Sequence, residues 1–302
     1  MINFNDDSLP QALIASFAAL MVIVILVFIG FVFITAFPTF MSQGLYFFTG
    51  QKWDYESNTY GSLNVIAGTL ILTLVTIILA CPTCILTAIY LSEFAPKTYR
   101  NIARPMIELL VGIPSVVYGI FGLFIVEPVF ASSVYPSISG ALGFIPIFHQ
   151  NAQGSGNGIL LASSILAIMI APTIIAISEE SIRSVPQEYR EASYAIGATK
   201  WETVVKVVLP SSLTGIVTGV ILGMMRAMGE TMAVIMLMGN NPQIPTSILD
   251  KGYAITSKIL CDAEAHIVVD EYRSAIFALA ATLFMMEALL LIATRCTSRS
   301  AK

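Results

Sequence analysis

The sequence predicts an all-α integral membrane protein with six transmembrane helices, and three observations support that prediction. Hydrophobic residues make up 56 % of the 302-residue chain and charged residues only 11 %, whereas about a quarter of the residues of a soluble domain are charged. Six apolar stretches are long enough to cross a bilayer, which takes about 20 helical residues. Because backbone polar groups in lipid must bond within their own segment, these stretches are expected to be helices.

The six predicted spans follow one another without a long linker, so residues 1–302 are expected to form a single membrane domain. No basic cluster precedes the first span, which is therefore expected to remain as an anchor instead of being removed as a signal peptide. Pro114 and Pro172 lie in the third and fourth spans, and both helices are expected to kink. The spans are residues 12–37, 63–91, 106–126, 159–177, 213–238 and 275–294.

The distribution of Lys and Arg predicts the orientation of the chain in the cytoplasmic membrane. Short loops rich in basic residues are retained in the cytoplasm. Ten basic residues lie on the predicted inner side and four on the outer side, so both termini are expected in the cytoplasm. The ten are Lys97, Arg100, Arg104, Arg183, Arg190, Lys200, Lys206, Arg295, Arg299 and Lys302, and the four are Lys52, Lys251, Lys258 and Arg273.

Several functional classes are excluded by composition. The net charge is −4 and no basic block occurs, which argues against nucleic acid as a partner. Four scattered cysteines and two histidines predict neither a disulfide scaffold nor a metal site, and no cofactor is expected. No nucleophile or metal cluster suits a membrane-embedded enzyme, so the chain is predicted not to be an enzyme.

Arg226 is the one basic residue that the predicted loops do not contain. It lies about 13 residues into the fifth span, roughly 20 Å along it. Insertion scales put the cost of an arginine there at about 2.5–3.5 kcal/mol, so a substrate pathway is the favoured interpretation. Glu230 follows one helical turn later, and we expect it to neutralise Arg226 at rest and to yield during passage. A purely structural ion pair is the alternative.

Two further features of the spans are candidate parts of the pathway. Ser115 follows Gly112 and Pro114 in the third span, and a helix break of this kind either lines a cavity or is an inert bend. In the fifth span a stripe of small residues permits close approach of another helix. That stripe predicts either a seam bordered by Arg226 or packing against neighbouring helices of the same chain. Its glycines are Gly215, Gly219 and Gly223. Glu108 and Glu287 are expected to reach the interface.

The predicted cytoplasmic loop 179–212 reads as two short helices that would dock into a partner. Pro186 suits the first turn of the first helix and Gly197 its end. Thr199 followed by Glu202 is a capping box for the second helix, which Pro210 is expected to stop.

This loop resembles the EAA motif of ABC importer permeases. Glu191-Ala192-Ser193, Gly197 and Val207-Val208-Leu209-Pro210 follow the motif, with Ser193 in place of its third alanine and Val207 in place of its isoleucine. In that family the segment forms coupling helices that fit a cleft in the cytoplasmic ATPase subunit. The resemblance implies the same role here for Glu191, Ala192, Gly197, Leu209 and Pro210.

Further segments resemble the C-type permease subunits of Pst phosphate importers over almost the whole chain. The resemblance implies the MetI-like type I importer fold and a transporter of inorganic phosphate. The partners it implies are a second, A-type permease, two ATP-binding subunits and an external phosphate-binding protein. Membrane lipid is a further expected partner of the chain. The segments are residues 48–54, 68–70, 113–119, 226–234 and 239–240.

The sequence agrees with this resemblance in two respects, and it leaves open both the cargo and the class of transporter. No Gly-Lys dipeptide occurs, so the chain has no phosphate-cradling GxxxxGK[ST] loop, and ATP hydrolysis is expected in a separate subunit. A guanidinium suits an oxyanion, which makes Arg226 chemically apt for phosphate. Phosphonate, molybdate or sulfate are alternative cargoes. A secondary transporter or channel is a further alternative, although it would need no docking loop.

Overall fold

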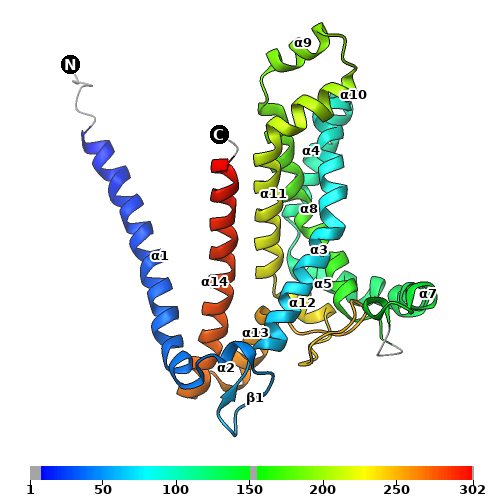
Figure 1. The fold of residues 1–302 in the computed structure, drawn as a ribbon. Helices are drawn as coiled ribbons and strands as arrows, with labels where there is room; N and C mark the ends of the chain where they lie inside the picture. The colour runs from blue at the N-terminus through cyan, green and yellow to red at the C-terminus, as the bar shows by residue number, and fades with distance from the viewer. Residues whose placement is uncertain (1–7, 150–154, 301–302) are drawn as a thin grey trace.

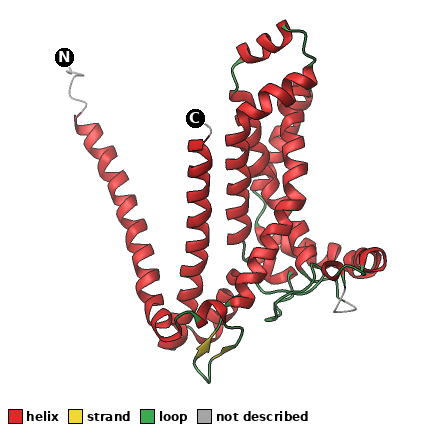
Figure 2. Cartoon of the chain, in the orientation of Figure 1, coloured by secondary structure: helices red, strands yellow, loops and turns green. Residues whose placement is uncertain are grey.

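The computed structural model describes residues 8–149 and 155–300, which are helical almost throughout (Figure 2). Six helices in those residues are long and apolar enough to cross a membrane, which confirms the predicted fold class. A two-stranded antiparallel hairpin, in which Trp53 pairs with Tyr60, lies at one end of the molecule (Figure 1). These helices are Gln11–Gln43, Leu63–Phe94, Ser115–Leu142, Ile159–Ser184, Lys200–Gly229 and Asp270–Ile292, and each contains a segment of membrane-spanning length.

The elements follow the chain in a simple order. The N-terminal part contains α1 (Ser8–Gln43), α2 (Tyr46–Thr49), β1 (Trp53–Asp54), β2 (Thr59–Tyr60), α3 (Leu63–Ile89), the π-helical turn η1 (Tyr90–Phe94) and α4 (Lys97–Val111). The middle contains α5 (Ser115–Phe121), η2 (Gly122–Val126), α6 (Glu127–Val129), η3 (Phe130–Val134), α7 (Tyr135–Leu142), η4 (Pro146–Phe148) and α8 (Ile159–Ser184). The C-terminal part contains α9 (Gln187–Ala195), α10 (Lys200–Thr203), η5 (Val204–Val208), α11 (Leu209–Gly229), α12 (Met232–Leu237), α13 (Ile255–His266) and α14 (Asp270–Ser300).

α8 is the centre of the main bundle. It packs against both α3 and α11, and 67 % of its most apolar window is buried. A helix that is apolar on all sides belongs in the interior. Leu161, Ile165, Ile170 and Ile174 are accordingly among the fully buried side chains.

α1 and α14 form a separate pair beside this bundle, joined to it near the hairpin (Figure 1). Edge-to-face ring contacts hold the pair together, with ring centroids 5.5 Å apart for Phe31 and Phe277 and 6.1 Å apart for Phe33 and Phe284. The first part of α1 diverges from α14, and its most apolar window is not buried at all. That surface is left for lipid or for another chain.

The third predicted span, 106–126, is not one continuous helix. α4 ends at Val111 and α5 begins at Ser115, because Pro114 cannot donate to the helix and disfavours helical geometry in Ile113 before it. The longest uninterrupted helical run in this region, Ser115–Leu142, also continues past the predicted end of the span. Figure 1 shows its last part, α7, projecting to the side of the bundle.

The fifth predicted span, 213–238, differs at both ends. Helix runs without a break from Lys200 to Gly229, so Pro210 does not stop it as expected. The π-helical turn η5 precedes this proline, and its wider i→i+5 bonding tolerates a residue that lacks an N–H group. At the other end, Glu230 is extended, with ψ 131°, and only the short α12 follows.

Both ends of the described chain lie at the same end of the molecule as α9, opposite the hairpin and α13 (Figure 1). α8 continues to Ser184, so the predicted loop 179–212 includes the last turn of that helix and the start of the next. Lys302 and the side chains of Arg295 and Arg299 lie outside the described residues.

Candidate functional site

The guanidinium of Arg226 reaches from α11 to α8. Its Nη1 donates to Thr173 Oγ1 at 3.0 Å, and Arg226 is half-buried. Thr173 lies near the middle of α8, so Arg226 sits at the depth of the centre of that membrane helix. A guanidinium carries five N–H donors. Since this is its one hydrogen bond to the described residues, most of its donors remain available to an anion.

Glu230 does not pair with Arg226, contrary to the sequence prediction. Within the described residues no ion pair joins the two, because α11 ends at Gly229 and the one-turn spacing is lost. The Glu230 carboxylate instead accepts from the backbone N–H groups of Thr231, at 3.2 Å, and Ala233, at 3.4 Å. Glu230 therefore stabilises the beginning of α12.

Two helices that follow breaks in the chain, α5 and α12, pack against each other. Ser115 is the first residue of α5, directly after the break at residues 112–114. α5 packs against α12, and a Cβ on Gly119 would lie 2.7 Å from the sulfur of Met236. The Tyr118 hydroxyl donates across the break to the carbonyl of Leu110 at 3.1 Å. The structure thus brings the Ser115 segment and the α11–α12 break together, although no hydrogen bond between described residues joins Ser115 to Arg226.

The glycine stripe of α11 packs within the chain, against α8, which is the second of the two predicted alternatives. A Cβ on Gly215 would lie 2.1 Å from Ser181 Oγ, and one on Gly223 would lie 2.7 Å from Ile174 Cγ1. Gly219 faces Ile177 in the same interface. The stripe therefore sets the close approach of the two helices across which Arg226 reaches Thr173.

Glu287 lies within α14, which runs from Asp270 to Ser300, and its expected position at the membrane interface stays a prediction. Its Oε1 would lie 3.5 Å from a Cβ on Gly229, at the end of α11.

A polar cluster lies on the side of Thr173 that faces α4. A cavity of about 120 Å³ between α4 and α8 is lined by Thr173 at one end and by Arg104 and Glu179 at the other. Glu179 is almost fully buried, and its carboxylate lies 3.8 Å from Arg104 Nε and 3.6 Å from Arg183 Nη1. Glu108, which pairs with Arg104 at 3.6 Å, is exposed.

The predicted docking segment is exposed at the far end of the bundle. α9 follows Pro186 and ends before Gly197, whose φ of +85° is the left-handed conformation that glycine adopts readily. Glu191 and Ala192 are exposed, and Ile196 is 85 % exposed. Leu209 and Pro210 do not lie in a loop but in the first turn of α11, where Leu209 is half-buried and Pro210 exposed.

The capping box of α10 has formed as predicted. Thr199 accepts from the backbone N–H of Glu202, and the Glu202 carboxylate accepts from the backbone N–H of Thr199 at 3.0 Å. These bonds, with the Thr199 hydroxyl and Lys206, lower the pKa of Glu202 to about 2. The carboxylate is therefore ionised at any physiological pH.

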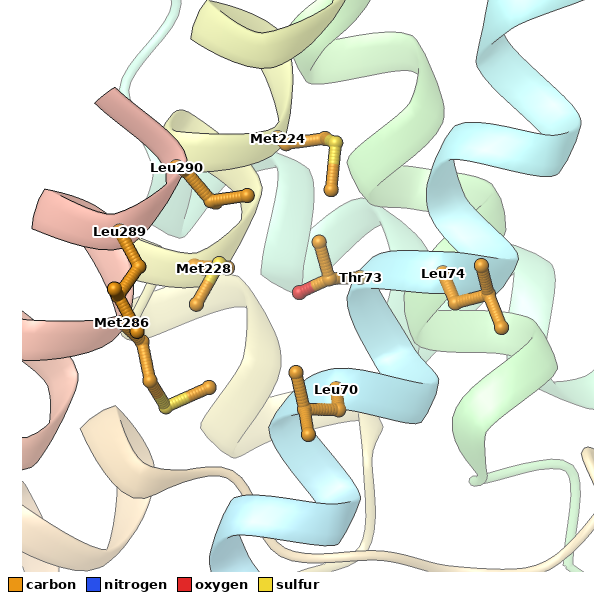
Figure 3. Close-up of a pocket in the computed structure, with 8 residues that line it drawn as sticks. All are labelled: Leu70, Thr73, Leu74, Met224, Met228, Met286, Leu289 and Leu290. Atoms are coloured by element: carbon orange, nitrogen blue, oxygen red, sulfur yellow. The ribbon is translucent and has the colours of Figure 1, made fainter. Parts of the chain in front are cut away.

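An apolar cavity of about 360 Å³ lies between α3, α11 and α14 and does not suit an anion (Figure 3). Thr73 is its one polar lining residue, and the Thr73 hydroxyl already donates to the carbonyl of Thr69 at 2.8 Å. In the described part of the chain no group of three or more His, Cys, Asp or Glu residues could hold a metal ion. The other lining residues are Leu70, Leu74, Met224, Met228, Met286, Leu289 and Leu290.

Solved structures show which class of protein has this fold. A chain of a bacterial alginate ABC transporter matches with a TM-score of 0.62 at 18 % identity, over 98 % of this chain and 97 % of that one. A chain of the MetNI methionine ABC transporter in an inward-facing conformation matches with a TM-score of 0.54 at 16 % identity, over 80 % of this chain and 94 % of that one. The fold is that of an ABC transporter permease subunit.

The family follows from the sequence comparison. The chain belongs to the family described as "Binding-protein-dependent transport system inner membrane component", whose model matches residues 84–297. The phosphate transport system permease protein PstC of Xylella fastidiosa strain 9a5c is 38 % identical over 256 residues, covering 84 % of this chain and 78 % of the relative. PstC of Haemophilus influenzae is 33 % identical over 291 residues, covering 96 % and 92 %. A probable ABC transporter permease protein of Bacillus subtilis, YqgH, is 32 % identical and covers 84 % and 78 %.

Proposed function

We propose that this chain is the permease subunit of an ATP-driven importer of inorganic phosphate. The cargo rests on the relatives whose names contain phosphate transport, at up to 38 % identity over most of the chain. The observation that carries the proposal within the structure is Arg226, a guanidinium placed at the depth of the middle of α8 with one neutral hydrogen-bond partner among the described residues. Such a group can offer forked donors to an oxyanion that enters between the helices.

The proposed working unit contains further chains. A second permease subunit would complete the pathway, and the two permeases would rest on two ATP-binding subunits, one of which would dock on the exposed α9 surface around Glu191. An external binding protein would deliver phosphate. Glu191, Ala192 and Gly197 are proposed as part of the ATPase contact because they lie exposed at the tip opposite the hairpin. Both termini are proposed to be cytoplasmic, since the two ends of the described chain share that end of the molecule with α9.

Reconstitution of the complete complex in vesicles tests this proposal. Vesicles that hold the permeases, the ATP-binding subunits and the external phosphate-binding protein should accumulate labelled phosphate only when ATP is supplied on the ATPase side. Vesicles that hold this chain alone should accumulate none. Accumulation without ATP or without the partners would contradict the proposal and favour a secondary transporter.

Competition identifies the cargo among the oxyanions. An excess of unlabelled phosphate should remove the uptake of labelled phosphate, whereas molybdate, sulfate or a phosphonate at the same concentration should leave it nearly unchanged. If one of those anions competes better than phosphate does, it is the cargo.

A further inference from the structure

Arg190 is a buried arginine directly before the exposed docking residues of α9, and it bonds to two membrane-spanning segments. Its Nη2 lies 2.7 Å from Glu93 Oε1 and also donates to the carbonyl of Ile182 at 2.9 Å, while its Nη1 donates to the carbonyl of Val185. The side chains of Arg190 and Glu93 are only 11 % and 9 % exposed. The guanidinium thus donates to three acceptors, of which Glu93 is distant in the chain and Ile182 and Val185 lie shortly before Arg190.

The acceptors of Arg190 belong to different membrane helices. Glu93 lies in η1, the π-helical turn that ends the second span, 97 residues earlier in the chain. Ile182 is in the last turn of α8, and Val185 follows that helix. One side chain on the docking helix therefore holds the ends of two spans.

The same two spans lead to the candidate pathway. α3 and α8 pack against each other along their length, and α8 carries Thr173, the partner of Arg226. Arg100 also braces the end of the second span from α4, since it donates to the carbonyls of Leu91 at 2.7 Å and Ser92 at 2.8 Å. A displacement of the Glu93 segment would thus be passed to α3, α4 and α8 together.

α9 has a second polar attachment, to α10. The hydroxyls of Ser193 and Thr203 lie 2.9 Å apart and are buried, which joins α9 to α10 and so to the helix that contains Arg226. Most of the remaining surface of α9 is exposed. Among the described residues, Arg190 and Ser193 are accordingly the two side chains of α9 whose polar contacts would pass a force on this helix to the membrane bundle.

We propose that Arg190, paired with Glu93, is the positioning residue that transmits movement of the docking helix to α3 and α8. This inference rests on the proposed function, because it requires an ATPase that moves α9. A buried ion pair with extra hydrogen bonds holds one geometry, and removal of one partner leaves an unpaired buried charge. Loss of the pair would leave the exposed docking face in place but allow α9 to move without the membrane helices.

The test measures the number of phosphate ions taken up per ATP hydrolysed by the reconstituted complex. We expect Glu93→Gln and Arg190→Gln each to lower this ratio at least tenfold while the ATPase rate changes less than threefold. The double variant should be no worse than the more severe single variant, because both changes remove one interaction. Lys206→Gln is the matched control, since it breaks an exposed ion pair with Glu202 in the same region, and its ratio should stay within twofold of wild type.

Each outcome of this experiment decides between the inference and its alternatives. If Glu93→Gln keeps the ratio of phosphate taken up to ATP hydrolysed within twofold of wild type, the pair does not transmit movement. The same conclusion holds if transport and ATPase activity fall by the same factor. Failure of both Glu93→Gln and Arg190→Gln to assemble would overturn the inference too, because the pair would then be purely structural. If the wild-type complex transports no phosphate, the proposed function is wrong. If the wild-type complex transports phosphate and the variants keep its ratio of phosphate to ATP, only the role of the Arg190–Glu93 pair is wrong.

Discussion

Arg226 is held by a neutral hydroxyl from Thr173 and not by a carboxylate within the described chain. A neutral partner orients the guanidinium without cancelling its charge, so the positive potential remains available to an anion. Glu230, four residues later, has its carboxylate directed at the backbone of α12. At the scale of single residues, the candidate site is therefore a positioned cation.

Substitution of Arg226 should strongly reduce phosphate uptake while the complex still assembles. Arg226→Gln loses charge-assisted hydrogen bonds worth about 1.5–3 kcal/mol, so uptake should fall about 10- to 100-fold or more. Arg226→Lys keeps the positive charge but loses the paired N–H donors with which a guanidinium binds an oxyanion, so this variant should retain intermediate uptake. The measurement is ATP-dependent uptake of labelled phosphate, with complex assembly followed by co-purification. Wild-type uptake by the Arg226→Gln complex would remove this residue from the mechanism.

The capping box of α10 should persist in mild acid. The pKa of Glu202 is lowered from 4.5 to about 2, so its ionised form stabilises the folded loop at pH values above about 4.5. That contribution is lost as the pH falls from about 4.5 towards 2. Titration of the Glu202 carboxyl carbon by NMR should therefore give a midpoint near 2, and Thr199→Ala should raise that midpoint. A midpoint near 4.5 in the unmodified protein would show that the box is open in solution.

The α8–α11 interface depends on the absence of side chains. Ser181 Oγ, which donates to the carbonyl of Ser212 at 2.9 Å, occupies the space where a Cβ on Gly215 would lie. Small residues let helices approach closely where lipid offers no hydrophobic driving force. At the scale of the helices, the close contact of α8 and α11 determines that the Arg226 side chain can hydrogen-bond to Thr173.

A single methyl group at this interface should destabilise the protein. Gly215→Ala places a Cβ 2.1 Å from Ser181 Oγ and 2.5 Å from Ser181 Cβ, and overpacking of this kind costs about 1–3 kcal/mol. Thermal unfolding of the detergent-solubilised protein should show a lower midpoint. Gly30→Ala in α1, where no atom lies within 4 Å, is the control and should leave the midpoint unchanged. Equal midpoints for both variants would contradict the packing described here.

At the scale of the whole molecule, one end carries α9 and both ends of the described chain, and the opposite end carries the hairpin and α13 (Figure 1). Exposed groups at the α9 end include Ile196 at 85 % and Trp201 at 60 % exposure. The most apolar window of α1 is exposed throughout. These surfaces are the ones that an assembled importer would cover with a partner or with lipid.

The proposed orientation predicts which residues can be labelled from each side. In a variant without the four native cysteines, Ile196→Cys should react with a membrane-impermeant thiol reagent only after the cytoplasmic face is opened. Ser57→Cys, in the exposed hairpin turn, should react in intact cells. The reversed pattern would invert the orientation and place the docking helix outside.

Much of the fold could be predicted because its signals are local. Apolar runs of membrane length, the Thr199–Glu202 capping box and the left-handed Gly197 each depend on residues within one segment. Arg226 was identifiable for the same reason, as a cation within an apolar run. The ends of the broken helices were harder, because the π-helical turn before Pro210 and the extended Glu230 depend on packing around them.

The fold class, the six membrane-length helices and the two short helices of the predicted docking segment could be assigned from the amino-acid pattern, because hydropathy and capping patterns act over a few turns of helix. Three contacts became known from the folded chain: the Glu230 carboxylate bonds to the backbone at the start of α12, the glycine stripe packs against α8, and Arg190 pairs with Glu93. Those contacts join segments far apart in the chain or depend on where a helix ends. These contacts are stabilised by packing between segments, which a pattern of neighbouring residues does not encode.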